Sequence, residues 1–481
     1  MKQYKRLFPI ILVALVFLGY FSYLSGDFLL DDKSLILRNR VLTREKPLRS
    51  IFTTSLQGKP HTYRPLQVLN YVVEYKIWKL NRFGYHLTSI VLHAVNAILV
   101  YYLFSLLLPV GLARIVSILF AVHPVNVPVV GYISGRADLL VFFFMLVSII
   151  FVLKFINSRL KIYYLLSIFA GFLAFFCREN SLILFLLIFL TASVNKSGLK
   201  KAILLSLPFL ALSCIYIILY SLFSRQIVIG LFPVHMSPLF VVINFLNIIP
   251  RYLGVLILPL NLHMFRSTEF IQSFLDAKML SVIVFLALSG YILCKFRRNK
   301  PFVLGALWFL IGLIPVLFLL NRYPWLNRAM MAESWLYIPS LGFFLLLALF
   351  VHKFSRAGGI LLCAYVCLCL YITYQQHIYW NDRIVSYKNI LKYLPEKNPK
   401  RKHIVIEYLR RGLYDEAFVE LNKFARSYPD SSDRYLLEGD YYYAVNNLVK
   451  ARECYNIALT LGSKKRTIME KLRKIEVKDG Q

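Results

Sequence analysis

Two adjacent carboxylates, Asp31 and Asp32, follow the first strongly apolar segment of the chain. Neighbouring carboxylates repel each other, which raises the pKa of one of them and leaves a base poised to remove a proton. The same pair also suits a helix N-cap, where an Asp side chain accepts hydrogen bonds from backbone amides. The spacing alone leaves two interpretations open, a base poised for proton abstraction or a helix cap.

Further charged side chains suited to substrate binding stand in short segments along the chain. Eleven Lys or Arg residues occupy the stretch from Lys33 to Arg82, which suits an anionic lipid phosphate, although plain contact with lipid headgroups explains it equally well. The other groups gather around residues 123–138, 177–180 and 321–333, where capped or interfacial helix ends are the alternative. The candidate binding residues are Arg64, His123, Arg136, Asp138, Arg178, Glu179, Arg328 and Glu333.

Apolar segments must position these groups, because 58% of the 481 residues are hydrophobic and only 17% are charged. Runs of about 18 or more apolar residues recur, and each is long enough to cross a bilayer as a helix. Clear examples are residues 7–24, 139–155, 202–223, 279–296 and 302–320. The sequence therefore predicts an all-α, multi-pass integral membrane protein with about eleven spans.

The distribution of basic residues predicts the orientation of the spans. Basic clusters at 2–6, 154–161, 196–201, 295–300 and 353–356 all fall on the cytoplasmic side if the N-terminus starts there. The connections 26–85, 131–136, 177–180, 224–238 and 321–335 then face outward. Residues 238–259 interrupt the count with Asn244, Asn247, Pro250 and Arg251, and we expect a re-entrant or interfacial segment there. The net charge of +32 follows this loop pattern, which does not favour a nucleic-acid partner.

A polar tail, residues 375–481, follows the membrane part, residues 1–374. Within it Ala417 and Ala451 are 34 residues apart, as are Tyr408 and Tyr442. This period is typical of tetratricopeptide repeats, which are paired amphipathic helices. An unrelated helical hairpin is the alternative. Two repeats are fewer than such arrays normally need, so the tail is expected to lean on the membrane part or on a partner.

Several reaction classes are disfavoured by the motifs. The chain contains no Gly-rich phosphate loop, no Cys/His zinc spacing and no nucleophile elbow, which argues against a nucleotide-driven pump and a serine hydrolase. A transporter would need broken helices with polar sites at the membrane midplane, whereas the acids here cluster at outward helix ends. Cofactors stay unknown, and a requirement for a divalent cation stays open.

Several motifs in this order resemble the GT-C superfamily of membrane glycosyltransferases, specifically its TMTC-like branch, which carries tetratricopeptide repeats after the membrane domain. The resemblance runs nearly end to end. The motifs that carry it are residues 30–32 with Asn39, then 63–66, 85–93, 119–124, 134–140, 178–179, 332–339 and 379–382.

The resemblance implies a transferase that takes a sugar from a polyprenyl-phosphate donor on the extracytoplasmic side and passes it to a protein or surface-glycan hydroxyl. A first-loop carboxylate is catalytic in such enzymes, which selects Asp31 with Asp32 beside it. Membrane lipids are implied partners, and the repeat domain would hold a protein acceptor. The chain departs from the family pattern at Pro128, where Glu is usual, and at Ser334, where Arg is usual.

Those two departures keep other functions in view. One is a non-catalytic scaffold or assembly protein with a degenerate transferase fold. Another is a ligase or polymerase of surface polysaccharide, which also uses lipid-linked donors.

Overall fold

The computed structural model describes residues 2–43, 47–53, 56, 62–195, 198–224, 237–317, 319–320, 328–462 and 465–479. The chain divides into two compact units, Met1–Trp380 and Asn381–Gln481. Each is described by itself below. The domain boundary expected after residue 374 lies within helix α15 (Ser355–Asn381), close to the point where the two units meet.

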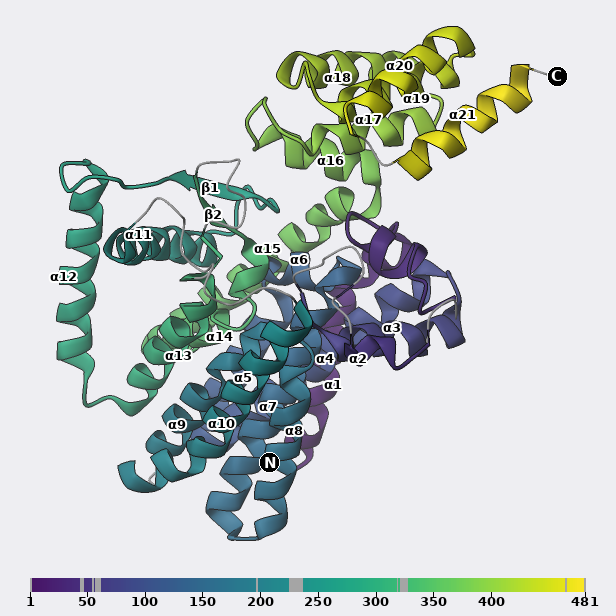
Figure 1. Cartoon of the computed structure of the whole chain (residues 1–481). Helices are drawn as coiled ribbons and strands as arrows, with labels where there is room; N and C mark the ends of the chain where they lie inside the picture. Colours follow the sequence, from purple (N-terminus) through teal and green to yellow (C-terminus); the bar gives the residue numbers. More distant parts are fainter. Residues whose placement is uncertain are drawn as a thin grey trace. The chain divides into compact units, whose positions relative to one another are not determined.

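The first unit is a bundle of apolar helices (Figure 1). Among the described residues, eight helices are long and apolar enough to cross a membrane. They occur in α1 (Lys2–Tyr20), α4 (Arg82–Leu107), α7 (Arg136–Ser158), α10 (Leu199–Ser224), α11 (Pro238–Ile257), α12 (Lys278–Phe296), α13 (Lys300–Leu317) and α15.

Four further apolar segments are bent or shorter. Helix α5 (Val110–Val122) continues through the short turn η3 (Pro124–Asn126) into α6 (Val127–Val130) with a bend of 50°. The shorter helices are α8 (Lys161–Phe175), α9 (Leu184–Val194), which follows the turn η5 (Glu179–Ile183), and α14 (Ser340–His352). The membrane architecture is confirmed, and the count of about eleven spans stays a prediction.

Small and hydroxyl-bearing residues let the helices of this bundle approach closely. A Cβ on Gly305 in α13 would lie 2.9 Å from the carbonyl oxygen of Gly342 in α14, so these backbones are nearly in contact. Ser148 in α7 and Ser167 in α8 bond each other through hydroxyls 3.1 Å apart. Close backbone approach at glycine and hydrogen bonds between hydroxyl groups are both typical of helices that pack within lipid. Lipid is as apolar as the side chains, so the hydrophobic effect does not drive such helices together.

The predicted first loop is a folded element with its own apolar core. It follows the turn η1 (Phe21–Ser25) and contains the short helical segment η2 (Lys33–Leu37) and the helices α2 (Ser50–Thr53) and α3 (Pro65–Trp78). Buried side chains of η2, α2 and α3 pack against Tyr85 at the start of α4 and against Ile133. The carboxylate pair therefore stands on a supported scaffold.

Of residues 238–259, which the sequence set apart from the spans, all but the last two form one continuous helix, α11, that contains Pro250. Figure 1 shows α11 lying across the direction of α12. After α11 the chain forms strand β1 (Arg266–Glu269), which pairs antiparallel with β2 (Arg328–Met331), so that Arg266 faces Met331 and Glu269 faces Arg328. The turn η8 (Glu333–Leu336) follows β2.

The second unit is entirely helical in its described residues. Its helices are α16 (Arg383–Lys392), α17 (Arg401–Arg410), α18 (Tyr414–Ser427), α19 (Ser432–Ala444), α20 (Leu448–Thr460) and α21 (Lys465–Asp479). Helix α17 packs on α18 and α19 packs on α20, and Ala417 and Ala451 are fully buried in corresponding helices. These two hairpins have the predicted 34-residue register, and their identity as tetratricopeptide repeats stays a prediction.

Candidate active site

Asp32 is completely buried beyond the end of the first span. It stands at the N-cap position of η2, yet its side chain makes no capping bond. Its Oδ2 instead accepts from the Leu29 amide at 2.9 Å, and its Oδ1 accepts from the amide of Ser134 at 2.9 Å and from the Ser134 hydroxyl. The helix-cap alternative therefore does not describe this carboxylate.

Burial raises the pKa of the Asp32 carboxyl to about 7, and the negative charge of Asp31 acts in the same direction. The hydrogen bonds from Ser134 and Leu29 oppose this shift because they stabilise the charged form. A pKa near neutral pH lets a carboxyl group both accept and release a proton at that pH, which is the property that a general acid or base needs.

Asp31 is held differently, because its side chain is only partly buried. Its backbone amide donates to the Tyr132 hydroxyl at 2.8 Å, and the preceding Leu30 has a φ of 40°. A non-glycine residue in this left-handed region is strained, and such strain clusters at functional sites. The turn therefore fixes the backbone of Asp31 and leaves part of its side chain open to a substrate.

The five residues from Ser134 to Asp138, which we call the hub segment, connect the first loop to the rest of the site. The first of them, Ser134, holds Asp32. The last, Asp138, forms a buried ion pair with Arg178. The neighbour of Arg178, Glu179, accepts two bonds from Arg64, from Nε at 3.0 Å and from Nη2 at 2.5 Å. The hub segment thus brings three predicted outward connections to one end of the bundle.

Arg64, Arg178, Asp138 and Glu179 form one alternating cluster of charges. Asp138 also attracts Arg64 electrostatically, and Arg178 attracts Glu179 in the same way. Two cations and two anions cancel, so the cluster carries no formal net charge. The side chain of Glu179 keeps 26% of its surface exposed, against 6% for Arg64. Glu179 is therefore the member of that pair that a substrate reaches more easily.

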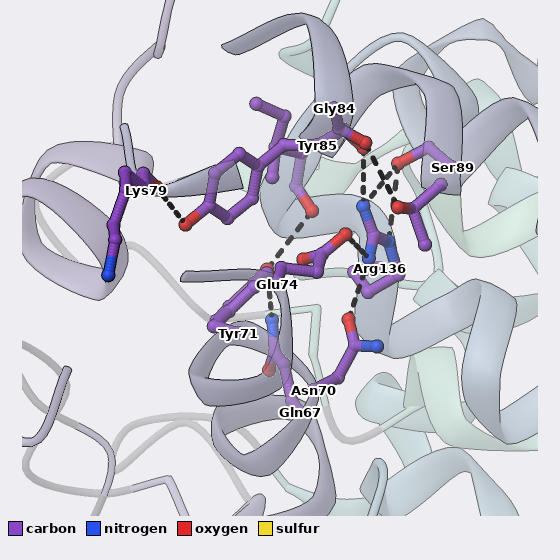
Figure 2. Close-up of polar contacts among 11 residues, drawn as sticks. Gln67, Asn70, Tyr71, Glu74, Lys79, Gly84, Tyr85, Ser89 and Arg136 are labelled. Atoms are coloured by element: carbon purple, nitrogen blue, oxygen red, sulfur yellow. Dashed lines mark hydrogen bonds and ion pairs between the residues drawn. The ribbon is translucent and has the colours of Figure 1, made fainter. Parts of the chain in front are cut away.

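The middle residue of the hub segment, Arg136, is enclosed (Figure 2). Its guanidinium donates to Glu74 at 2.7 Å, to Asn70 and to the Tyr85 carbonyl at 2.6 Å each, and to Ser89 at 3.1 Å. None of its surface is exposed. The network favours a structural role for Arg136, which locks the hub segment onto α3 and α4, over the expected contact with a donor phosphate.

Glu333, a further candidate, lies in a second group of polar residues. Glu333 is buried after β2 and accepts from Arg266 Nε at 3.0 Å and from the His263 amide at 2.9 Å. Burial raises the pKa of Glu333 to about 7, and Arg266 opposes the shift. The turn η8, which begins at Glu333, packs against η3 and α6, the elements that lead into the hub segment.

His123 and Arg328 are engaged elsewhere in this region. His123 is buried, and its Nε2 lies 3.1 Å from both the Leu256 carbonyl oxygen and the Tyr365 hydroxyl. Arg328 pairs with the exposed Glu269 at 3.1 Å. The rest of the predicted 321–335 connection, residues 321–327, lies outside the described residues. Among the described residues, Asp32 is bonded to Leu29 and Ser134 and to none of these groups.

Sequence reasoning missed three residues that shape the site, namely Ser134, Tyr132 and Asn70. A signal for Asn70 was available, since Gln67, Asn70 and Glu74 recur at helical spacing and share one face of α3. Tyr132 and Ser134 lie four and two residues before Arg136, within the polar segment 123–138. Nothing in that motif showed which first-loop groups they bind.

Metal binding was left open by the sequence. Within the described ranges, no group of three or more His, Cys, Asp or Glu side chains is arranged to hold a metal ion.

Comparison with known proteins gives one consistent set of names, although no family model matches the chain. The chain is 28% identical over 425 residues to the protein O-mannosyl-transferase F38B6.6 of Caenorhabditis elegans, an alignment that covers 80% of this chain and 58% of that protein. It is 24% identical to the human protein O-mannosyl-transferase TMTC3, with coverage of 94% and 54%. The chain therefore spans little more than half the length of these relatives.

Two further similarities cover less of their targets or are more distant. The Drosophila melanogaster protein O-mannosyl-transferase Tmtc1 is 34% identical over 134 residues, which are 26% of this chain and 16% of that protein. Among solved structures, the Archaeoglobus fulgidus oligosaccharyltransferase tethered with an acceptor peptide aligns with a TM-score of 0.41 and 12% identity. That alignment covers 87% of this chain and 59% of the other.

Proposed function

We propose that this chain, which is a TMTC-like membrane protein, is a glycosyltransferase that moves a sugar from a polyprenyl-phosphate donor to an acceptor hydroxyl. The observation that carries the proposal is the carboxylate pair at one end of an apolar helical bundle, where Tyr132 holds the backbone of Asp31 and Ser134 of the hub segment holds Asp32. The names of the relatives make a mannosyl group the first sugar to test and a protein hydroxyl the first acceptor.

Asp31 is the proposed general base. The acceptor oxygen attacks the anomeric carbon of the sugar while its proton passes to the Asp31 carboxylate, and the bond from that carbon to the phosphate oxygen breaks. The lipid phosphate leaves with the electron pair. Asp32 has its oxygens occupied by three donors, so its proposed role is to position the turn and to tune the charge of its neighbour.

The leaving phosphate needs cationic stabilisation rather than protonation. Of the arginines expected to supply it, Arg64 and Arg178 remain candidates, each already paired with a carboxylate. In this proposal the acidic partners hold the guanidinium groups in place, and the donor phosphate competes for the hydrogens that face the substrate. The cluster would then orient the phosphate without exposing an uncompensated charge before the donor binds.

The orientation of the chain belongs to the same proposal. We place the N-terminus in the cytoplasm and the carboxylate pair with the second unit on the extracytoplasmic side, because the basic clusters favour this topology. The helical hairpins of the second unit would hold the protein acceptor near the membrane, since solenoid faces bind extended partners. An alkaline phosphatase fusion after Gln481 should be active, and a fusion near Arg298 should be inactive.

A non-catalytic scaffold remains the competing function, and the departures at Pro128 and Ser334 favour it. Pro128 is buried in α6, and Ser334 follows the buried Glu333 directly. If the usual Glu and Arg of the family contact substrate there, their loss would remove activity without disturbing the fold.

The deciding experiment uses membranes that contain the full-length chain. They are incubated with polyprenyl-phosphate mannose or glucose labelled in the sugar, and label in protein and glycan fractions is measured. We expect transfer by the wild type from one donor and loss of transfer by Asp31→Asn. Absence of transfer from every donor, with a protein that is folded and inserted, would favour the scaffold.

A further inference from the structure

Arg251 is an exposed cation on the apolar helix α11. Among the described residues it forms no ion pair, and in residues 1–380 the only acid outside the described ranges is Glu45. An unneutralised charge on a helix of this composition is costly unless it reaches a polar headgroup or a bound ligand. Its position therefore calls for an anionic partner from outside the described chain.

A second donor lies one helical turn earlier. Asn247 is 4% exposed, and its Nδ2 is buried without a hydrogen-bond partner in the described structure. Residues four apart in a helix lie on the same side, so this amide and the Arg251 guanidinium share one stripe of α11. Buried donors are almost always satisfied, which makes an unpartnered one a sign of a missing ligand or water.

The helix around these two residues is fixed on both sides. Asn244 bonds Ile271 twice, donating to its carbonyl at 2.9 Å and accepting from its amide at 2.8 Å. Tyr252, the neighbour of Arg251, accepts from the Ala332 amide at 3.2 Å. These contacts set the rotation of α11 about its axis, so the stripe with Asn247 and Arg251 is held in one direction before any ligand arrives.

The surroundings indicate what kind of anion fits. Leu239, Val242 and Ile257 are exposed large apolar residues on α11. A ligand at Arg251 would meet an apolar helix surface and a cationic donor, with the amide of Asn247 one helical turn away, which suits an amphipathic molecule with an anionic oxygen group. A soluble acidic peptide would leave that apolar surface uncovered.

We propose that Asn247 and Arg251 form a binding site for a lipid phosphate on α11. Either the phosphate of a polyprenyl lipid or the headgroup of an anionic phospholipid supplies this chemistry. The proposal does not depend on glycosyl transfer, because it concerns binding alone and would hold for a scaffold as well as for an enzyme.

The test measures binding of three lipids to the purified full-length chain in detergent. The probes are undecaprenyl phosphate, undecaprenol, which lacks the phosphate, and phosphatidylglycerol. Arg251→Gln should weaken binding of at least one phosphate lipid by about tenfold or more, the usual scale for a charge-assisted bond. Asn247→Leu should weaken the same lipid less. Binding of undecaprenol should not change in either variant.

The control is Arg298→Gln, which removes an exposed arginine from the turn between α12 and α13 of the same unit. A loss confined to undecaprenyl phosphate identifies a polyprenyl lipid as the ligand, and a loss shared with phosphatidylglycerol identifies a general anionic headgroup. Wild-type affinity of Arg251→Gln for both phosphate lipids, or an equal loss in Arg298→Gln, overturns the proposal. If Arg251→Gln does not fold, unchanged affinities for both phosphate lipids in both Asn247→Leu and Arg251→Met overturn it.

Discussion

Ser134 donates both its backbone amide and its hydroxyl to the same carboxylate oxygen of Asp32, across 102 residues of sequence. This contact joins the first loop to the start of α7 and holds Asp32 in a fully buried position, out of reach of a substrate hydroxyl. Its more exposed neighbour, Asp31, has its backbone fixed but is not enclosed. The two adjacent acids are therefore distinguished by their surroundings rather than by their type.

The first prediction separates the two carboxylates by their effect on rate. Asp31→Asn keeps the size of the side chain but cannot accept the proton, so sugar transfer should fall by about 10²–10⁴-fold, the usual contribution of a general base. Asp32→Asn should lose less activity. The measurement is transfer of labelled sugar in membranes at saturating donor. The opposite ranking would assign the base to Asp32, and full activity in the double variant would exclude this mechanism.

The second prediction concerns pH and stability. The pKa of Asp32 is raised from 3.8 to about 7 and that of Glu333 from 4.5 to about 7. Between about pH 4 and pH 7 each of these two carboxyls therefore binds more protons in the folded state than in the unfolded state, so its own contribution to stability falls as pH rises through this window. Burial lowers the pKa of His263, which acts in the opposite direction, so the prediction is a difference: relative to variants that lack the two carboxyls, the unfolding temperature of the wild type in detergent should be higher at pH 5 than at pH 8.

The matched variants are Asp32→Asn and Glu333→Gln, each of which should remove its own contribution to the pH dependence, and the double variant should remove both contributions. Asp27→Asn, which changes an acid of the same loop that pairs with Arg82, serves as the control and should keep the slope. A double variant with the wild-type slope would show that other groups set the pH dependence.

A third prediction addresses the enclosed ion pair of Arg136 and Glu74. Removing one member of a buried pair leaves the other charge unpaired, which typically costs about 3–5 kcal/mol. Arg136→Met should therefore unfold at a clearly lower denaturant concentration, and the double variant Arg136→Met with Glu74→Gln should recover part of the loss. Arg328→Met, which breaks the exposed pair with Glu269, should change stability little. Equal losses in the single and double variants would contradict the coupling.

The fourth prediction uses a glycine within the hub segment. A Cβ on Gly135 would lie 2.8 Å from the Cα of Val129 and closer still to its carbonyl oxygen, so the backbone must move to accept a side chain. Gly135→Ala should cost about 1–3 kcal/mol, as overpacking does, and should reduce transfer by displacing Ser134. Gly111→Ala, where a Cβ meets nothing within 4 Å, is the control. Equal behaviour of the two variants would mean that the segment is more tolerant than its packing implies.

Much of this architecture could be predicted, because length and apolar composition define membrane helices strongly. The carboxylate pair and the polar segments around residues 134 and 178 were also evident, since charged residues are rare in such a sequence. The pairing of these groups was not evident, because Arg64 meets Glu179 and Arg136 meets Glu74 only after the bundle has formed. The expectation that these arginines contact a substrate did not foresee that each is also paired with an acid within the chain.

Helix α11 illustrates the other difficulty. Two Asn, one Pro and one Arg lowered its apolar character enough to suggest an interruption, yet the chain forms a continuous helix. The side-chain amide of Asn244 donates a hydrogen bond to the carbonyl of Ile271, 27 residues away. A partner that distant cannot be recognised from the sequence around Asn244.

The separation of Arg64 from Glu179 has a consequence for biosynthesis. The two residues are 115 positions apart, and ribosomes add about 5–20 residues per second. The arginine is therefore synthesised about 6–23 s before its carboxylate exists. During that interval the synthesis of the first loop is completed while its ion pair with Glu179 cannot yet form. The site is thus assembled late, and a nascent chain that stops before residue 179 holds the proposed base without the cluster that surrounds it.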